Sequence, residues 1–172
     1  MTHLTTEELE AGLHLIQESP ADGGAVEMIV RRPRVGEREL LEQADLDPTL
    51  GLVGDRWGTK IGNPENQINI MNARVIALVA GDRDRWSLAG DQLFVDLDLS
   101  EANLPIGSRI AIGSAILEVT APPHTGCSKF AARFGMEARA FVNARKHLRL
   151  RGINARVVQG GTIRVGDRAR KL

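Results

Sequence analysis

The stretch LPIGSRIAIGSAILEVT, residues 104–120, contains two apolar runs separated by two small residues. The runs at 109–112 and 115–120 are rich in isoleucine, leucine and valine, and β-branched residues of this kind are enriched in strands. Gly113-Ser114 between them is a two-residue loop that suits a type II′ turn, because glycine readily takes the positive φ that this turn requires. The stretch therefore predicts a β-hairpin.

Short apolar runs and glycine turns recur on both sides of this hairpin. Runs typical of strands occupy residues 25–33, 67–71 and 93–99, and the last alternates in a way that predicts a half-buried strand. Gly160-Gly161 lies between 154–159 and 162–165 and predicts a second hairpin, whereas 37–44 fits either a strand or a short helix. Because closure removes exposed strand edges, many short strands predict a mainly β fold with a few short helices, built as a closed or nearly closed β-barrel.

Two helices are indicated by capping residues. Thr5 and Glu8 have capping-box spacing and precede apolar residues at helical intervals, which predicts a helix over about 5–18. Asn72 is a suitable N-cap for a short apolar helix over 72–80.

Size and charge limit the class of protein. A chain of 172 residues can form one domain with a substantial core, and we expect 1–172 to be a single domain. The 22 basic and 22 acidic residues cancel, and tyrosine is absent, so neither nucleic acid nor an anionic membrane is an expected partner. No apolar run approaches the ~20 residues of a membrane span. With an acidic N-terminus and one cysteine, the sequence predicts a cytoplasmic protein.

The only cysteine, Cys127, lies in the stretch PPHTGCSKFAARFG, residues 122–135. The two prolines stiffen the chain before it, and the residues after it have a helical composition, so Cys127 should lie at or just before a helix N-terminus. Backbone N–H groups there favour an anion. Together with His124, Lys129 and Arg133, this position predicts a thiol pKa below its ordinary value.

Two interpretations of this cysteine remain open. It is either a buried, inert residue, since free cysteine is among the most buried residue types, or a reactive thiolate that handles sulfur or binds a soft metal. Its neighbours Lys129 and Arg133 could instead line an exposed helix face. Arg151 is interpreted as part of a solvated basic run, and Arg156, inside an apolar strand, would need an anionic partner if it faced inward.

Several motifs occur in the order typical of one family. They are GLVGDR (51–56), GDQLFV (90–95), the hairpin stretch at 104–120, HTGCSKF (124–130) and RGINARVVQGGTIRVGD (151–167). In these motifs the chain resembles the MOSC domain, the C-terminal domain of molybdenum cofactor sulfurases. The resemblance covers about residues 50–170 and leaves 1–49 as an N-terminal extension.

The resemblance implies a β-rich barrel and a cysteine that handles sulfur or binds the molybdenum cofactor, molybdopterin. On this basis Cys127 is the catalytic residue, and it carries a persulfide or serves as the molybdenum ligand. Because the pterin of the cofactor carries a phosphate, Arg56, Lys129 and Arg156 are candidate anchors, with His124 beside the cysteine as a further cofactor-binding residue.

The resemblance leaves three functions open. The first is a standalone protein that handles the molybdenum cofactor, supplied by a sulfur donor of the cysteine desulfurase kind. The second is a molybdenum-dependent reductase of N-hydroxylated compounds that needs an electron-donor partner. The third is a non-catalytic module that binds or delivers the cofactor. Pyridoxal phosphate is not expected to bind this chain, because the ~50 residues before the match are too few for a domain of that kind.

Overall fold

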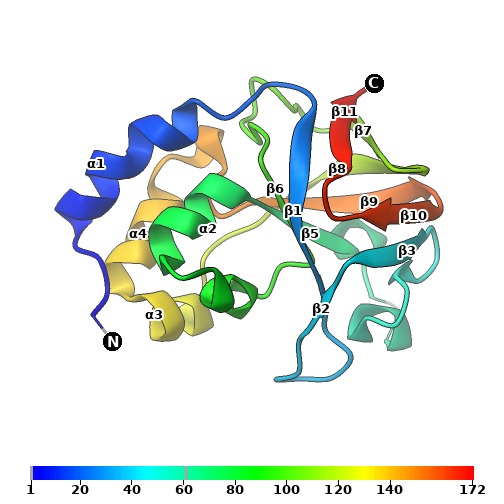
Figure 1. Ribbon diagram of the computed structural model, residues 1–172, viewed down its shortest axis with the longest axis horizontal. Helices are drawn as coiled ribbons and strands as arrows, with labels where there is room; N and C mark the ends of the chain where they lie inside the picture. Colours follow the sequence, from blue (N-terminus) through cyan, green and yellow to red (C-terminus); the bar gives the residue numbers. More distant parts are fainter. Residues whose placement is uncertain (1, 61) are drawn as a thin grey trace.

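The computed structural model describes residues 2–60 and 62–172. Seven strands close into a barrel, because β11 and β6 both pair with β1 (Figure 1). In order around the barrel they are β1 (Gly24–Arg31), β11 (Arg168–Lys171), β7 (Arg109–Ile112), β8 (Ala115–Pro123), β9 (Ile153–Gln159), β5 (Ile68–Asn72) and β6 (Leu93–Val95). The short strand β2 (Glu39–Leu41) extends the sheet from β1. The predicted closed β-barrel is confirmed.

The hairpin formed by β7 and β8 is confirmed in detail. Ile112 faces Ala115 across the turn, and Gly113 has a φ of 55°. Ser114 does not share this positive φ, as a type II′ turn requires.

The second predicted hairpin is wrong. Strand β10 (Gly161–Arg164) pairs with β3 (Gln43–Asp47), which in turn pairs with β4 (Gly51–Leu52), so these three strands form a separate sheet. Neither glycine at 160–161 has the positive φ that a two-residue hairpin turn needs. A Cβ on Gly161 would instead lie 2.5 Å from the Oγ of Ser114, so glycine allows the chain to pass close to the first hairpin.

The predicted strand at 93–99 is shorter and more buried than its alternation indicates. Strand β6 ends at Val95, and its three residues are all buried. Leu93 belongs to the core inside the barrel, whereas Phe94 packs into the core beneath the helices. Because both faces of the strand are covered, the prediction of a half-buried strand is wrong.

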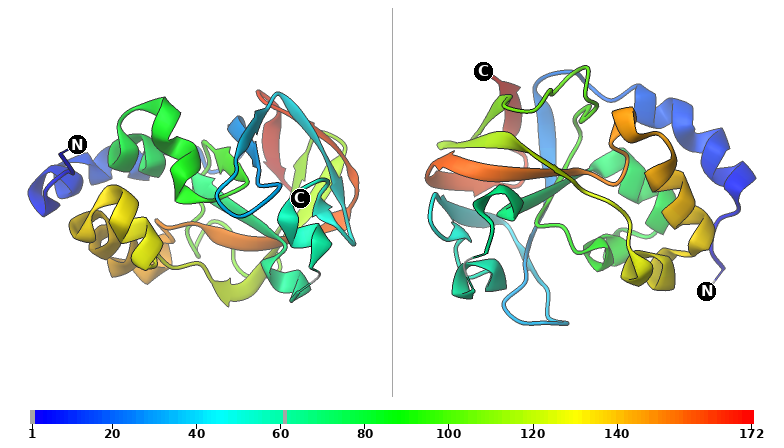
Figure 2. Two further views of the ribbon diagram at one scale, coloured as in Figure 1. Left: turned by 90° about the horizontal axis from the view of Figure 1, so that it is seen from below. Right: turned by 180° about the vertical axis from the view of Figure 1, so that it is seen from behind.

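Four α-helices gather on one side of the barrel (Figures 1 and 2). They are α1 (Thr6–Gln17), α2 (Ala73–Ala80), α3 (Ser128–Phe134) and α4 (Met136–Ala144). The capping box at Thr5 and Glu8 and the Asn72 cap of α2 are both confirmed. None of the described helices is long and apolar enough to cross a membrane.

Short 3₁₀ turns complete the connections. They are η1 (Arg56–Thr59), η2 (Pro64–Asn66), η3 (Arg83–Ala89) and η4 (Lys146–Leu148). The segment from β8 to β9 contains α3, α4 and η4, and it therefore carries the cysteine from the barrel to the helical side of the molecule. The aromatic residues of α3, Phe130 and Phe134, are buried there, and full burial of such a side chain contributes about 1.5–3 kcal/mol.

Candidate functional site

Cys127 is the N-cap residue of α3, as the sequence predicts, and its side chain is exposed. The backbone is extended at this residue, with φ −103° and ψ −176°. The backbone N–H groups of Phe130 and Lys129 and the charge of Arg151 lower the thiol pKa from its ordinary value of 9.0, although partial burial opposes them. The arrangement favours an accessible thiolate, and the interpretation of Cys127 as a buried residue is wrong.

The cationic side chains predicted to act on the thiol have other partners or lie in solvent. Lys129 is exposed and acts on the thiol through its backbone N–H group. Arg133 donates from a guanidinium nitrogen to the carbonyl of Leu88, at 2.7 Å. The cation that lowers the thiol pKa is instead Arg151.

Arg151 is buried, so its interpretation as part of a solvated basic run is wrong. Its guanidinium donates to Oδ1 of Asp91 at 2.7 Å and to the carbonyl of Ala89 at 2.9 Å. The same group lies 5.1 Å from the ring centre of Phe130, in the helix that begins after the cysteine. The buried carboxylate, the carbonyl and the ring together stabilise a charge that burial alone would exclude.

Asp91 is fully buried and has a second partner. Nε2 of His124 lies 3.2 Å from Oδ2 of Asp91. Burial alone would raise the pKa of Asp91, but the charges and hydrogen bonds of Arg151 and His124 hold it below its ordinary value. The carboxylate therefore stays ionised and fixes His124, which is half-buried, three residues before the cysteine.

The peptide group just before the cysteine is held by α4. The backbone N–H of Gly126 donates to Oδ1 of Asn143 at 2.7 Å, and Nδ2 of Asn143 donates back to the carbonyl of Gly126 at 3.0 Å. Nε of Arg139 donates to the same carbonyl at 3.2 Å. A Cβ on Gly126 would lie 3.1 Å from Val142, a tight approach. These contacts position the thiol relative to the first turn of α3.

The end of η3 gathers three guanidinium groups. The carbonyls of three consecutive residues, 88–90, accept hydrogen bonds from Arg133, Arg151 and Arg32 in that order, at 2.7, 2.9 and 3.0 Å. One short segment thus links the arginine beneath the thiol to two further arginines.

Arg32 and Arg133 belong to a cluster of four arginines, here called the arginine cluster, whose other members are Arg38 and Arg56. Arg32 forms a bidentate pair with Asp55, with Nε to Oδ1 at 2.9 Å and a terminal nitrogen to Oδ2 at 2.7 Å. Burial lowers the pKa of Arg38, and the positive charges of the other three arginines lower it further. Burial and the charges of Arg32 and Arg133 likewise lower the pKa of Arg56, although the negative charge of Asp55 opposes this shift.

The arginine cluster leaves one buried donor unused. Nε of Arg38 is buried and has no hydrogen-bond partner among residues 2–60 and 62–172. Leaving such a donor unpaired costs about 1–3 kcal/mol, more when the group is charged. A multiply charged anion such as a phosphate would satisfy it and offset the repulsion among the guanidinium groups.

The sequence-predicted residues do not all converge on one site. Arg56 lies in the arginine cluster and Lys129 in the first turn of α3. Arg156 is exposed and pairs across the sheet with Glu118 at 2.7 Å, so it does not face inward. His124 lines a pocket of about 370 Å³, whose lining residues do not include Cys127.

Two arginines that the sequence did not indicate as site residues, Arg32 and Arg151, are held by buried aspartates. Arg32 pairs with Asp55, and Arg151 pairs with Asp91. Each aspartate follows a glycine beside an apolar run, and an ionised carboxylate in such a run needs a cationic partner. That pattern was a usable signal for buried ion pairs, although it does not name the arginines. Within the described residues, no group of three or more His, Cys, Asp or Glu lies together to hold a metal ion.

Comparisons with known proteins identify the family and the fold. The family profile of the MOSC domain matches residues 58–170. Among solved structures, the YuaD protein of Bacillus subtilis is similar with a TM-score of 0.60 and 21% identity, over 85% of this chain and 93% of that one.

YiiM of Escherichia coli is similar with a TM-score of 0.57 and 18% identity, over 86% of this chain and 69% of its own. YiiM of Geobacillus stearothermophilus has a TM-score of 0.54 and 14% identity, over 88% and 73%. At these identities the structures show a shared fold. No curated protein matches the chain.

Proposed function

The chain belongs to the MOSC domain family, and from this premise we propose that it binds the molybdenum cofactor with the thiolate of Cys127 facing the metal. The observation that carries the proposal is an exposed thiol with a lowered pKa at the start of α3, joined through residues 88–90 to the arginine cluster. A thiolate is a soft ligand, and arginines bind phosphate groups through paired donors.

The residues present fit the cofactor at both of its ends. The arginine cluster holds a buried Nε, on Arg38, that lacks a partner among the described residues and suits the phosphate of the pterin. Cys127 offers one thiolate to the metal end. When bound, the cofactor would supply a molybdenum centre capable of redox chemistry.

The chain's own residues would then have separate roles. Arg38 and Arg56 would bind the phosphate, and Asp55 would hold Arg32 in place for the same anion. Arg151 and the start of α3 would lower the pKa of the Cys127 thiol and so favour its thiolate. Asn143 would keep the thiol in position through Gly126.

The same thiolate can act as a sulfur carrier. It would attack the outer sulfur of a persulfide on a donor protein, the sulfur–sulfur bond of the donor would break, and the donor cysteine would leave as a thiolate. Cys127 would keep the transferred sulfur as its own persulfide. A low thiol pKa favours this attack because the thiolate is the nucleophile.

The test is elemental and chemical analysis of freshly purified protein. We expect bound molybdenum with pterin, or sulfane sulfur after incubation with a donor, and Cys127→Ser should lose either while its midpoint of thermal unfolding changes little. Serine is close in size, but its hydroxyl stays protonated at neutral pH. If Cys127→Ser retains full molybdenum and sulfane-sulfur loading, the proposal is wrong.

Variants of the arginine cluster separate the two ends of the site. Arg38→Gln and Arg56→Gln should weaken cofactor binding without changing persulfide formation at Cys127. Arg34→Gln is the matched control, because the Arg34 side chain is 81% exposed and lies 3.7 Å from Glu37. Equal cofactor binding by Arg38→Gln and Arg34→Gln would contradict the role given to the arginine cluster.

A further inference from the structure

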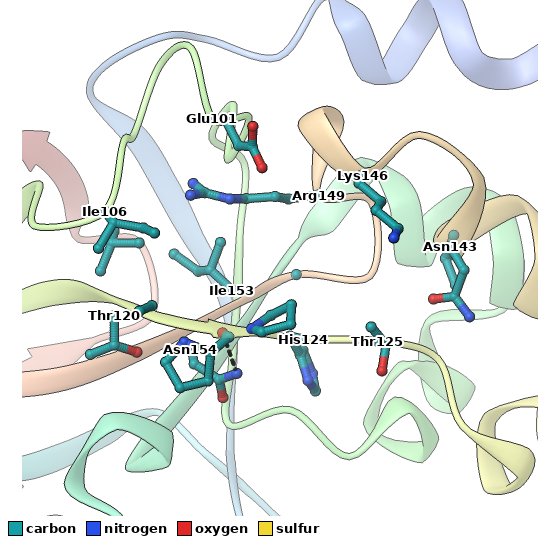
Figure 3. Close-up of a pocket in the computed structure, with 16 residues that line it drawn as sticks. Glu101, Ile106, Thr120, His124, Thr125, Asn143, Lys146, Arg149, Ile153 and Asn154 are labelled. Atoms are coloured by element: carbon teal, nitrogen blue, oxygen red, sulfur yellow. Dashed lines mark hydrogen bonds between the residues drawn. The ribbon is translucent and has the colours of Figure 1, made fainter.

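The pocket of about 370 Å³ lies against the chain that leads from β8 to the cysteine (Figure 3). Residues 119–125 and 152–154 line it, and the other lining residues are Glu101, Ile106, Val142, Asn143, Lys146 and Arg149. This volume is within the range of about 300–1,000 Å³ that small-molecule sites occupy. Its lining residues include none of the arginine cluster, so it is a separate feature of the molecule.

Three of the neutral polar side chains that line the pocket form hydrogen bonds to the protein itself. Asn143 accepts from the backbone N–H of Gly126 and donates to the carbonyl of the same residue. Thr120 and Asn154 each donate to a backbone carbonyl, at 2.5 and 3.0 Å. These groups shape the pocket but leave few free donors for a ligand, so its charged side chains decide which ligand it takes.

The charged side chains leave a positive excess. Arg149 is half-buried, and its hydrogen bonds run from one terminal nitrogen to the carbonyls of Leu99 and Leu104. Burial lowers the pKa of Arg149, and the carboxylate of Glu101 only partly opposes this. Nζ of Lys146 has no hydrogen bond or ion pair to the described part of the chain. Two cations therefore face one carboxylate.

The Lys146 ammonium and the Ile106 side chain lie at different ends of the pocket (Figure 3). Lys146, Asn143 and Thr125 lie at one end, and Ile106 lies at the other. The Arg149 side chain extends toward Ile106 beneath Glu101, so its charge lies next to a carboxylate, whereas that of Lys146 does not. Ile153 lies between the two ends and gives the pocket an apolar surface.

We propose that this pocket binds a small organic carboxylate with an apolar body, its carboxylate at Lys146 and its body against Ile106 and Ile153. The apolar wall would drive burial of the body, and the uncompensated ammonium would select the anion. This site goes beyond the cofactor-binding proposal and does not depend on Cys127 or on any bound metal.

The test is titration of the whole chain with phenylacetate and with its neutral isostere phenylacetamide, followed by calorimetry or ligand-observed NMR. We expect phenylacetate to bind with a Kd of about 1 mM, a value reasonable for a ligand of this size. The amide should bind about fivefold more weakly, because it loses the charge interaction of a solvent-exposed pair. Lys146→Gln should weaken phenylacetate to the same extent and leave the amide unchanged.

Two further variants make the outcome decisive. Ile106→Asp adds a negative charge at the apolar end, where the side chain is 60% exposed and the fold should tolerate it, and should abolish phenylacetate binding. Lys60→Gln, at an exposed lysine outside the pocket, should change nothing. Absence of binding at about 10 mM phenylacetate, equal binding of acid and amide, or equal effects of Lys146→Gln and Lys60→Gln would each overturn the proposal.

Discussion

Two buried aspartates, Asp55 and Asp91, have the same local arrangement but differ in the balance of charge around them. Each follows a glycine, each is at most 1% exposed, and each lies 2.7 Å from an arginine. Around Asp91 the charges balance, with Arg151 paired to the carboxylate. Around Asp55 they do not, because its partner Arg32 is one of four neighbouring arginines.

The difference shows how one motif serves two purposes. A balanced pair beneath the thiol supplies a fixed cation near Cys127 without leaving a charge unpaired. An unbalanced pair leaves a positive surplus that an external anion can neutralise. Gln92 lies between the two, since its Nε2 is 3.5 Å from Oδ2 of Asp55 and its chain neighbour is Asp91.

The largest effect should come from breaking the balanced pair. Asp91→Asn leaves the guanidinium of Arg151 buried beside a neutral amide, which should lower the free energy of unfolding by about 3–5 kcal/mol. Asp55→Asn should cost less, because the Arg32 side chain is 11% exposed, against 7% for Arg151, so water reaches it more readily when its partner is neutral. Urea unfolding of both variants measures the difference. An equal loss for the two would remove the distinction between the sites.

Acid should destabilise the protein through both aspartates. Their pKa values are lowered in the folded state, so the unfolded chain binds more protons as pH falls past the ordinary value of 3.8. The stabilisation is complete above that value and is lost as pH falls through the lowered values, by about 1.4 kcal/mol for each unit of lowering. Urea unfolding between pH 3 and pH 6 should show a shallower acid slope in Asp91→Asn, whereas a slope identical to that of the unmodified chain would contradict the account.

Removing one positive charge from the arginine cluster around Asp55 should have a smaller effect on the free energy of unfolding. Arg38→Met removes a partly buried arginine that repels its neighbours, so the free energy of unfolding should stay constant or rise by up to about 1 kcal/mol. Sulfate, used as a phosphate mimic, should raise the thermal midpoint of the unmodified protein more than that of this variant. Arg34→Met is the control, and an equal response to sulfate in both variants would argue against an anion site at the arginine cluster.

The features that the sequence predicted correctly depend on near neighbours in the chain. The hairpin at 109–120 follows from a glycine turn between two apolar runs, and the position of Cys127 follows from the prolines before it and the helical residues after it. The failed hairpin at 154–165 shows the limit of this reasoning. The partner of β10 is β3, which lies more than 100 residues earlier in the chain.

The candidate site was predictable only in part for the same reason. Arg151 and Asp91 are 60 residues apart in the chain, and only the folded structure brings them together in a buried pair. Conversely, Arg156 has an apolar setting in the sequence but lies on the exposed side of β9. Strand β1 lies before the matched residues 58–170, yet it completes the barrel.

The pH dependence of Cys127 alkylation tests the central claim, that the start of α3 and Arg151 lower the pKa of an exposed thiol. The account predicts an apparent pKa below the ordinary 9.0. Lys129→Gln should leave this value unchanged, because Lys129 acts through its backbone N–H group. An apparent pKa at or above 9.0 would contradict the account.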